Sequence, residues 1–246
     1  MATIPKGFAH GGWADDGQAL WLAGGLDVHG ASGAVWRLDL DCGVVERVGE
    51  LGGPVAYCGA AVLDGALWVV GGTPVDGDFT RASVRVWRVD LATRVIEALP
   101  GAGPASINPV VVALQGQLHV LPGSEWSAER RQLEAPDRVW IFSPKTRRWM
   151  QRPLGRIVPR GLTGTALDED RALLAGGAER RDGETVISSA VWIYDARDGS
   201  FVAQTALPAP RLASAMIRRG ADILLLGGED APRQRAATIW RWRSAP

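Results

Sequence analysis

The chain has 246 residues, and its 27 Lys and Arg balance its 27 Asp and Glu, so the formal net charge is zero. This balance gives no electrostatic case for a nucleic acid or an anionic membrane as partner. Two cysteines do not make a disulfide framework. The opening residues, MATIPKGFAHGG, show no signal peptide, and no apolar segment approaches the roughly 18 residues of a membrane span. We therefore expect a cytoplasmic protein, although a chain trimmed of a signal peptide would look the same.

Short apolar runs that end in a glycine pair recur along the chain. The runs ALWLAGG, ALWVVGG, RALLAGG and DILLLGG end at Gly25, Gly72, Gly177 and Gly228, and a degenerate copy, QLHVLPG, ends at Gly123. A second motif follows each run after a loop of variable length. Its copies are VWRLDL, VWRVDL, VWIFSP, VWIYDA and IWRWRS, led by Trp36, Trp87, Trp140, Trp192 and Trp240. Two independent markers with one period of about 50 residues indicate an internal repeat.

Each repeat reads as four short strands, named a to d in chain order. In the second repeat they cover about residues 58–63, 66–72, 84–91 and 94–99. Strand b is apolar almost throughout, which is typical of a strand covered on both faces. A four-stranded sheet that cannot cover its own faces, repeated five times, predicts a five-bladed β-propeller. We expect one all-β domain over 1–246, with blades at about 7–50, 55–100, 105–154, 160–206 and 211–246 plus 1–5.

The glycine pair after strand b and the aromatic residue on strand c resemble the kelch-repeat family. The resemblance covers essentially the whole chain, and VWIYDARDGSF and VWIFSPKTRRWM are its most typical segments. The third glycine pair departs from the pattern because it is Pro122-Gly123, and the Trp often found on kelch strand d is clear only at Trp149. Kelch propellers usually have six or seven blades, so the count of five leaves one alternative, a second copy that completes a larger ring.

The fifth repeat ends after strand c. The first residues, ATIP, resemble the ends of two earlier strands d, EALP and TALP, and directly precede the first strand a. We therefore expect residues 1–5 to pair beside TIWRWR and close the ring, which would remove free strand edges. The alternative is a frayed N-terminus and a three-stranded last blade.

The long, irregular b–c loops and the d–a loops fall on one face of an antiparallel propeller, and the resemblance implies that this face binds ligands. The sequence ERR occurs in two successive b–c loops, and the d–a connection between those blades adds two more arginines. The predicted arginine sector comprises Arg130, Arg131, Arg156, Arg160, Arg180 and Arg181, with Trp126 as a stacking surface. Guanidinium forks suit a carboxylate or a phosphate. The alternative is a set of solvated surface arginines in an Arg-rich chain.

Polar residues also lie at or just before the predicted starts of strand a, which lines the axis. They are Lys6, Tyr57, Asn108, Arg160 and Arg211. They predict either a central pocket or only the water-filled channel of a propeller, and we include Tyr57, Asn108 and Arg211 among the candidate ligand-binding residues.

Catalytic chemistry is hard to assemble from this sequence. The copper site of galactose oxidase, which shares the kelch fold, needs His and Tyr ligands that His10, His29 and His119 do not supply, and His119 takes a core Trp position. We predict no metal and no cofactor. The kelch resemblance also includes the N-acetylneuraminate epimerases, so a metal-free isomerase, epimerase or cyclase remains the alternative. Its central acids and arginines would be drawn from Glu125, Glu179, Glu229, Arg160, Arg180 and Arg211.

We therefore predict a monomeric kelch-type binding or scaffold protein. Its b–c and d–a face would hold a protein, an acidic peptide or a small anionic ligand, and neither nucleic acid nor a membrane. Fold alone does not decide between binding and catalysis, because propellers host both.

Overall fold

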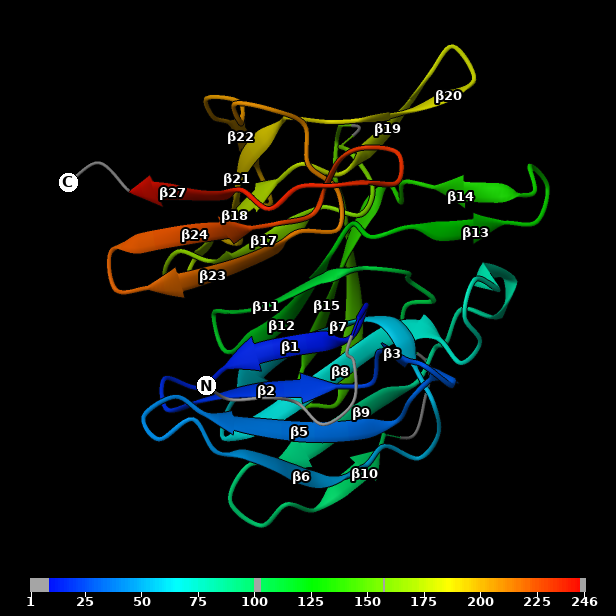
Figure 1. The fold of residues 1–246 in the computed structure, drawn as a ribbon. Helices are drawn as coiled ribbons and strands as arrows, with labels where there is room; N and C mark the ends of the chain where they lie inside the picture. Colours follow the sequence, from blue (N-terminus) through cyan, green and yellow to red (C-terminus); the bar gives the residue numbers. More distant parts are fainter. Residues whose placement is uncertain (1–8, 100–102, 157, 244–246) are drawn as a thin grey trace.

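The chain forms five antiparallel sheets arranged around an axis in the computed structural model, which describes residues 9–99, 103–156 and 158–243 (Figure 1). Each sheet is one blade, its strands follow one another along the chain, and the five blades confirm the predicted all-β propeller. The only helical element in these described residues is one 3-10 turn, η1 (Phe79–Arg81). No helix in this part of the chain is long and apolar enough to span a membrane.

The strands of the blades have these bounds. Blade 1 contains β1 (Gly12–Asp15), β2 (Ala19–Ala23), β5 (Ala34–Asp39) and β6 (Val45–Glu50). Blade 2 contains β7 (Ala56–Leu63), β8 (Ala66–Thr73), β9 (Val86–Asp90) and β10 (Ile96–Ala98). Blade 3 contains β11 (Val110–Leu114), β12 (Gln117–Leu121), β15 (Arg138–Ser143) and β16 (Arg148–Pro153). Blade 4 contains β17 (Thr163–Ala166), β18 (Arg171–Ala175), β21 (Val191–Asp195) and β22 (Phe201–Ala203). Blade 5 contains β23 (Ala215–Arg219), β24 (Asp222–Leu226) and β27 (Ile239–Arg243).

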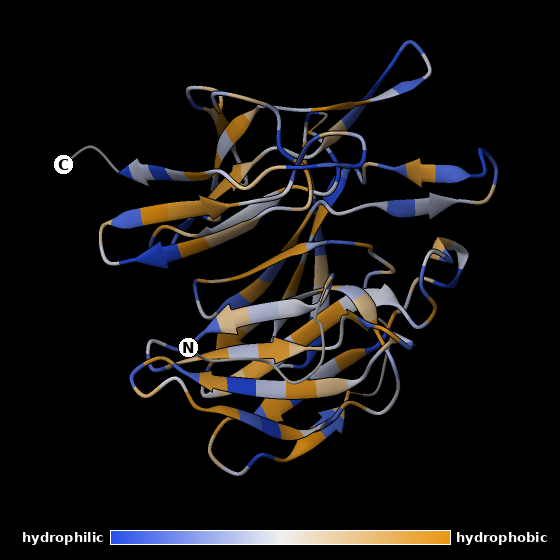
Figure 2. Cartoon of the chain, in the orientation of Figure 1, coloured by the Kyte–Doolittle hydropathy of each residue, from blue (hydrophilic) through white to orange (hydrophobic). Residues whose placement is uncertain are grey.

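Four of the five b–c connections are β-hairpins, so the expectation of irregular loops was wrong there. The hairpins are β3 (Leu26–Asp27) with β4 (Gly30–Ala31), β13 (Glu125–Ser127) with β14 (Gln132–Glu134), β19 (Ala178–Arg181) with β20 (Glu184–Ile187), and β25 (Glu229–Ala231) with β26 (Gln234–Arg235). In blade 2 the connection contains η1 instead. The hairpins extend strands b and c beyond the blade, and the tips of β13–β14 and β19–β20 are hydrophilic (Figure 2).

The glycine pairs form the joints between blades. Gly24 has a φ of +68°, and a Cβ added to it would collide with the backbone oxygen of Val55 in the next blade. The N–H of Gly25 donates to that same oxygen at 2.7 Å. Only glycine combines this conformation with so close an approach. The same joint recurs in two other blades, where Gly71 and Gly72 meet Ser106, and Gly176 and Gly177 meet Arg211.

Apolar cores lie at the joints between consecutive blades. Four buried clusters join blades 1 and 2, 2 and 3, 3 and 4, and 4 and 5. The tryptophans that lead strand c contribute to them, with Trp87 at 1% exposure and Trp140, Trp192 and Trp240 packed against the cluster edges. Trp36, the fifth member of the series, is half-buried. Hydrophobic residues accordingly follow the strands of the sheets (Figure 2).

The joint between blades 5 and 1 differs from the other four. The inner strands pack in sequence, β1 on β7, β7 on β11, β11 on β17 and β17 on β23, but within the described ranges no comparable packing joins β23 to β1. Blade 5 has three strands there, and Ile239 on β27 is 64% exposed. The predicted closing strand, 1–5, lies outside the described residues.

Candidate functional site at the axis

Five equivalent residues lie at the start of strand a or just before it. Each directly follows a residue that pairs with the end of strand b or with the b–c connection. They all have left-handed backbones, with φ between +49° and +62°, and are His10, Tyr57, Asn108, Gly161 and Ala213. Backbone hydrogen bonds join the first three members, from the N–H of Tyr57 to the oxygen of His10 at 2.5 Å and from the N–H of Asn108 to the oxygen of Tyr57 at 2.7 Å. These residues therefore line the inner end of the blades on the b–c and d–a face.

Three of the five positions carry polar side chains, and two carry glycine or alanine. Blades 1 to 3 carry His10, Tyr57 and Asn108, whereas blades 4 and 5 carry Gly161 and Ala213. A non-glycine residue in the left-handed region costs roughly 1 kcal/mol, and such strain gathers at functional sites. The side chains at these positions are thus smaller in blades 4 and 5 than in blades 1 to 3.

Tyr57 is the centre of a small aromatic and acidic cluster. Its ring lies 4.6 Å from that of His10, nearly stacked at 30°, and 5.3 Å from Phe79 in an edge contact. Its hydroxyl donates to a carboxylate oxygen of Asp76 at 2.7 Å. Burial and this carboxylate raise the pKa of Tyr57 to about 12, while burial lowers the pKa of His10. Asn108 is exposed next to this cluster. Tyr57 is thus protonated and hydrogen-bonded to Asp76, and His10 is neutral at pH 7.

Arg160 and Arg180 form a pair of like charges without a carboxylate partner. Arg160 is half-buried and bridges Ala178 through its backbone, which brings it close to Arg180 two residues further along β19. Neither side chain makes a hydrogen bond or an ion pair with the described residues. Burial and the charge of Arg180 lower the pKa of Arg160. The half-buried guanidinium of Arg160 is thus near enough to the exposed Arg180 for the charge of Arg180 to affect its pKa.

The other arginines of the two ERR sequences are arranged differently. Arg130 pairs with Glu134 at 2.9 Å, and Arg181 pairs with Glu179 at the same distance. Arg131 has a φ of +52° in the turn of the β13–β14 hairpin and is exposed. The tips of β13–β14 and β19–β20 point in different directions (Figure 1). The two sequences therefore do not bring their arginines to one point.

Arg156 and Arg211 cover tryptophans. Each guanidinium carbon lies 4.2 Å from the centre of an indole ring, Arg156 over Trp192 and Arg211 over Trp240. Arg156 also donates to the backbone oxygen of Phe201 at 3.0 Å. Arg211 is only 2% exposed, and its charge faces Asp230 at 3.7 Å. These two arginines are engaged in packing against strand c, which leaves Arg131, Arg160 and Arg180 as the members of the sector without a side-chain partner among the described residues, and of these only Arg160 is half-buried.

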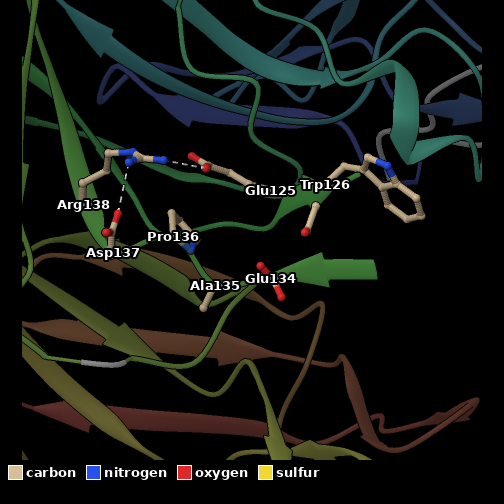
Figure 3. A pocket seen from close by; sticks show the side chains of 8 residues that line it. Glu125, Trp126, Glu134, Ala135, Pro136, Asp137 and Arg138 are labelled. Carbon is tan, nitrogen blue, oxygen red and sulfur yellow. Dashed lines mark hydrogen bonds and ion pairs between the residues drawn. The ribbon is translucent and has the colours of Figure 1, made fainter. Parts of the chain in front are cut away.

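Trp126 lies on β13, away from Arg160 and Arg180, where it lines a hollow together with Glu125 and Arg138 (Figure 3).

His119 is a core residue, as predicted, with 1% exposure and its Nδ1 2.9 Å from the hydroxyl of Tyr194. In the part of the chain that the structure describes, no group of three or more His, Cys, Asp or Glu side chains is placed to hold a metal ion. The sequence reasoning missed the roles of His10, Asp76 and Phe79. The one available signal was Asp76 in a long b–c loop.

Known proteins resemble this chain in sequence and in fold. No family model matches it. Among curated proteins, Beta-scruin of Limulus polyphemus is 22% identical over 200 residues, which are 80% of this chain and 21% of that protein. Spermatocyte protein spe-26 of Caenorhabditis elegans is 25% identical over 76% of this chain and 32% of its own length. N-acetylneuraminate epimerase of Yersinia enterocolitica is 29% identical over 55% of this chain and 43% of the enzyme. The chain thus spans less than half of each of these relatives.

The solved structure of YjhT aligns with 98% of this chain and 95% of its own, with a TM-score of 0.67 and 16% identity. A likeness at that identity shows the fold alone. Fold, repeat period and axis together define a five-bladed β-propeller. With the glycine-pair joints, the strand-c tryptophans and these relatives, the protein is a kelch-type β-propeller.

Proposed function

We propose that this protein is a monomeric binding module whose ligand lies at the axis, on the b–c and d–a face, and carries a carboxylate or a phosphate. The ligand is a small anion, an acidic peptide or an acidic segment of a protein. The observation that supports this is the Arg160–Arg180 pair, which is half-buried on one side and has no carboxylate partner among the described residues.

The Arg160–Arg180 pair is energetically costly when no anion is bound to it. A charged group removed from water loses hydration, and a like charge nearby adds repulsion. Both costs act on Arg160, as the lowered pKa of its guanidinium indicates. A bound anion offsets them, because charge-assisted hydrogen bonds from guanidinium groups contribute about 1.5–3 kcal/mol each. An arrangement that is unfavourable when empty becomes favourable when an anion is bound.

The remaining axial groups supply complementary contacts. Asn108 offers an exposed amide, and His10 and Tyr57 offer a stacked pair of rings. Gly161, which directly follows Arg160, and Ala213 carry the smallest side chains of the five axial positions. A ligand with an anionic end and a polar or planar body suits this combination.

The test is anion-dependent thermal stabilisation. Phosphate, citrate and a poly-glutamate peptide are titrated at constant ionic strength, because a ligand that binds the folded state raises its stability. We expect Arg160→Gln and Arg180→Gln to remove the stabilisation by anions while raising the melting temperature of the ligand-free protein. The matched control is Arg131→Gln, an exposed arginine on the same face, which leaves the response unchanged. An equal response in all four proteins would refute the proposal.

A metal-free epimerase is the second candidate, because N-acetylneuraminate epimerases of Yersinia are 29% to 30% identical over 54% to 55% of this chain. Of the three acids that could serve as bases, Glu125 pairs with Arg138 at 3.0 Å and Glu179 pairs with Arg181 at 2.9 Å. Glu229 pairs with Arg235 at 3.5 Å and is close enough to influence the pKa of His10. Incubation with N-acetylneuraminate, followed by proton NMR, separates the two functions. The binding proposal expects no acceleration of epimerisation, and acceleration that is lost in Glu229→Gln would replace it with the enzyme.

A further inference from the structure

The last strand of blade 5, β27, has an outer edge that no described strand covers. In each of the other four blades, strand c pairs with a strand d, which is β6, β10, β16 or β22. In blade 5 the described sheet ends with β27, which lies on the outer side of β24 (Figure 1). Such an edge offers backbone N–H and C=O groups to an extended segment. The outer edge of β27 is therefore a place where a strand can be added.

The side chains of β27 alternate between the two faces of the sheet. Trp240 and Trp242 pack against the apolar cluster between blades 4 and 5, and the guanidinium of Arg211 covers the ring of Trp240. The side chains of Arg241 and Arg243, on the other face, are 60% and 62% exposed. The core thus holds β27 on one face, and two cations are presented on the other.

Arg241 and Arg243 share a single acid. The carboxylate of Asp222 on β24 lies 2.9 Å from Nε of Arg243 but 3.8 Å from Nη1 of Arg241, which is too long for a hydrogen bond. In the strand register Asp222 is directly opposite Arg243, whereas Arg241 is opposite Leu224. Arg241 is therefore the less well neutralised of the two cations.

The other blades show which residue strand d places beside this position of strand c. The position directly follows the leading tryptophan, and it holds arginine in blades 1 and 2 and isoleucine in blades 3 and 4. Strand d has glutamate opposite each arginine and an apolar residue opposite each isoleucine. The four pairs are Arg37–Glu46, Arg88–Glu97, Ile141–Met150 and Ile193–Val202. Opposite charges at such positions stabilise a strand pair, so a strand d in blade 5 should carry an acid opposite Arg241.

The sequence has no further acid for that position. The residues outside the described ranges, 1–8, 100–102, 157 and 244–246, include no Asp or Glu. The expected closing strand, 1–5, would therefore leave Arg241 without an acid across from it. A strand from another molecule is not limited in this way.

We propose that the outer edge of β27 binds an extended segment of a partner protein, which pairs antiparallel as the fourth strand of blade 5 and places an acidic side chain opposite Arg241. Apolar residues flank this acid, as Ile96 and Ala98 flank Glu97 on β10. Backbone hydrogen bonds supply the affinity, and the acid supplies the selectivity. The site is separate from the one proposed at the axis, because β27 is the outermost described strand of its blade.

The probe is the peptide fluorescein-Gly-Thr-Val-Ile-Glu-Ala-Leu-amide, which contains the Ile-Glu-Ala sequence of β10, and binding is followed by fluorescence anisotropy. Two matched peptides carry Gln or Lys in place of Glu. We expect the Glu peptide to bind about two- to fivefold more tightly than the Gln peptide, which is the contribution of one cross-strand charge pair, and the Lys peptide to bind most weakly. Equal binding of the Glu and Gln peptides, or no binding of either, overturns the proposal.

A charge exchange tests the position of the peptide. Arg241→Glu should reverse the preference, so that this variant binds the Lys peptide more tightly than the Glu peptide. The matched control Arg219→Glu makes the same charge change at an exposed residue of β23, at the opposite edge of the same sheet, and keeps the original preference. An unchanged preference in Arg241→Glu, or a reversal of the same size in Arg219→Glu, contradicts the proposal.

Two further variants exclude other sites for the peptide. Deletion of residues 2–5 should leave binding of the Glu peptide unchanged, and binding that appears only after the deletion would mean that the chain itself fills the edge, which overturns the proposal. Loss of binding in Arg160→Gln would place the peptide at the axis and would overturn it as well. Melting curves of each variant confirm that it is folded.

Discussion

Acidification should weaken the core between blades 3 and 4 through a single histidine. His119 is 1% exposed, and its Nδ1 lies 2.9 Å from the hydroxyl of Tyr194, which is itself fully buried. Its other ring nitrogen, Nε2, has no hydrogen-bond partner in the described structure. Burial, with a smaller contribution from the charge of Arg152, lowers the pKa of His119 from 6.5 to about 4. The folded state therefore keeps this imidazole neutral where the unfolded chain protonates it.

The size of the effect follows from these two pKa values. Between pH 6.5 and about 4 the unfolded state binds a proton that the folded state does not, so stability falls as the pH falls. Linkage gives a loss of about 2.5 kcal/mol between about pH 7.5 and 4.5, a large share of the 5–15 kcal/mol of a typical domain. The paired carboxylates of Asp90 and Asp195, whose pKa values are lowered to about 2, lose their contribution mainly below this window.

Urea unfolding at the two pH values measures this loss. The matched variant His119→Gln keeps a polar side chain but has no proton to bind, so it should be less stable at neutral pH and lack most of the pH dependence. Burial also lowers the pKa of His10, so acidification acts on stability in the same direction there. If His119→Gln and the unmodified protein lose the same stability on acidification, the reasoning about His119 is wrong.

Two further predictions concern the joints and the thiols. Gly176→Ala places a Cβ against the backbone oxygen of Arg211 at a φ of +72°, and should lower the free energy of unfolding in urea by at least about 3 kcal/mol. The control Gly183→Ala, at a φ of +84° in open space, should lower it by about 1 kcal/mol. Equal losses would contradict the close approach between blades at Gly176. Cys42 is exposed, whereas burial raises the pKa of Cys58 to about 11. A thiol reagent at pH 8 should therefore modify one cysteine in the folded protein and two after denaturation. Rapid modification of both cysteines without denaturant would contradict the burial of Cys58.

The blade count was predictable because its markers are tied to the backbone. Glycine pairs recur where strand b must pass the next blade's carbonyl, as Gly24 and Gly25 do at Val55. The need for glycine at this close approach is local and recurs in each blade, so the glycine pairs appear in the sequence at a regular spacing. The hairpins among the b–c connections left a weaker signal, the Asp182-Gly183 turn between β19 and β20, which is a hairpin dipeptide.

The arginine sector was less predictable because the sequence does not show what lies across a strand. Glu134 on β14 neutralises Arg130 in the turn of the same hairpin, and Trp192 covers Arg156 from a strand about 36 residues later in the chain. Arg160 and Arg180 lack such partners among the described residues, and Arg160 is in addition half-buried. Whether a charged side chain is free depends on tertiary contacts, which composition and spacing do not encode.

The most direct test of the axial site is a crystal structure with bound selenate, whose selenium marks an anion by anomalous scattering. The account predicts an anomalous peak within hydrogen-bond distance of both Arg160 and Arg180, and none there in crystals of Arg160→Gln. Peaks at other arginines with none between these two would contradict it.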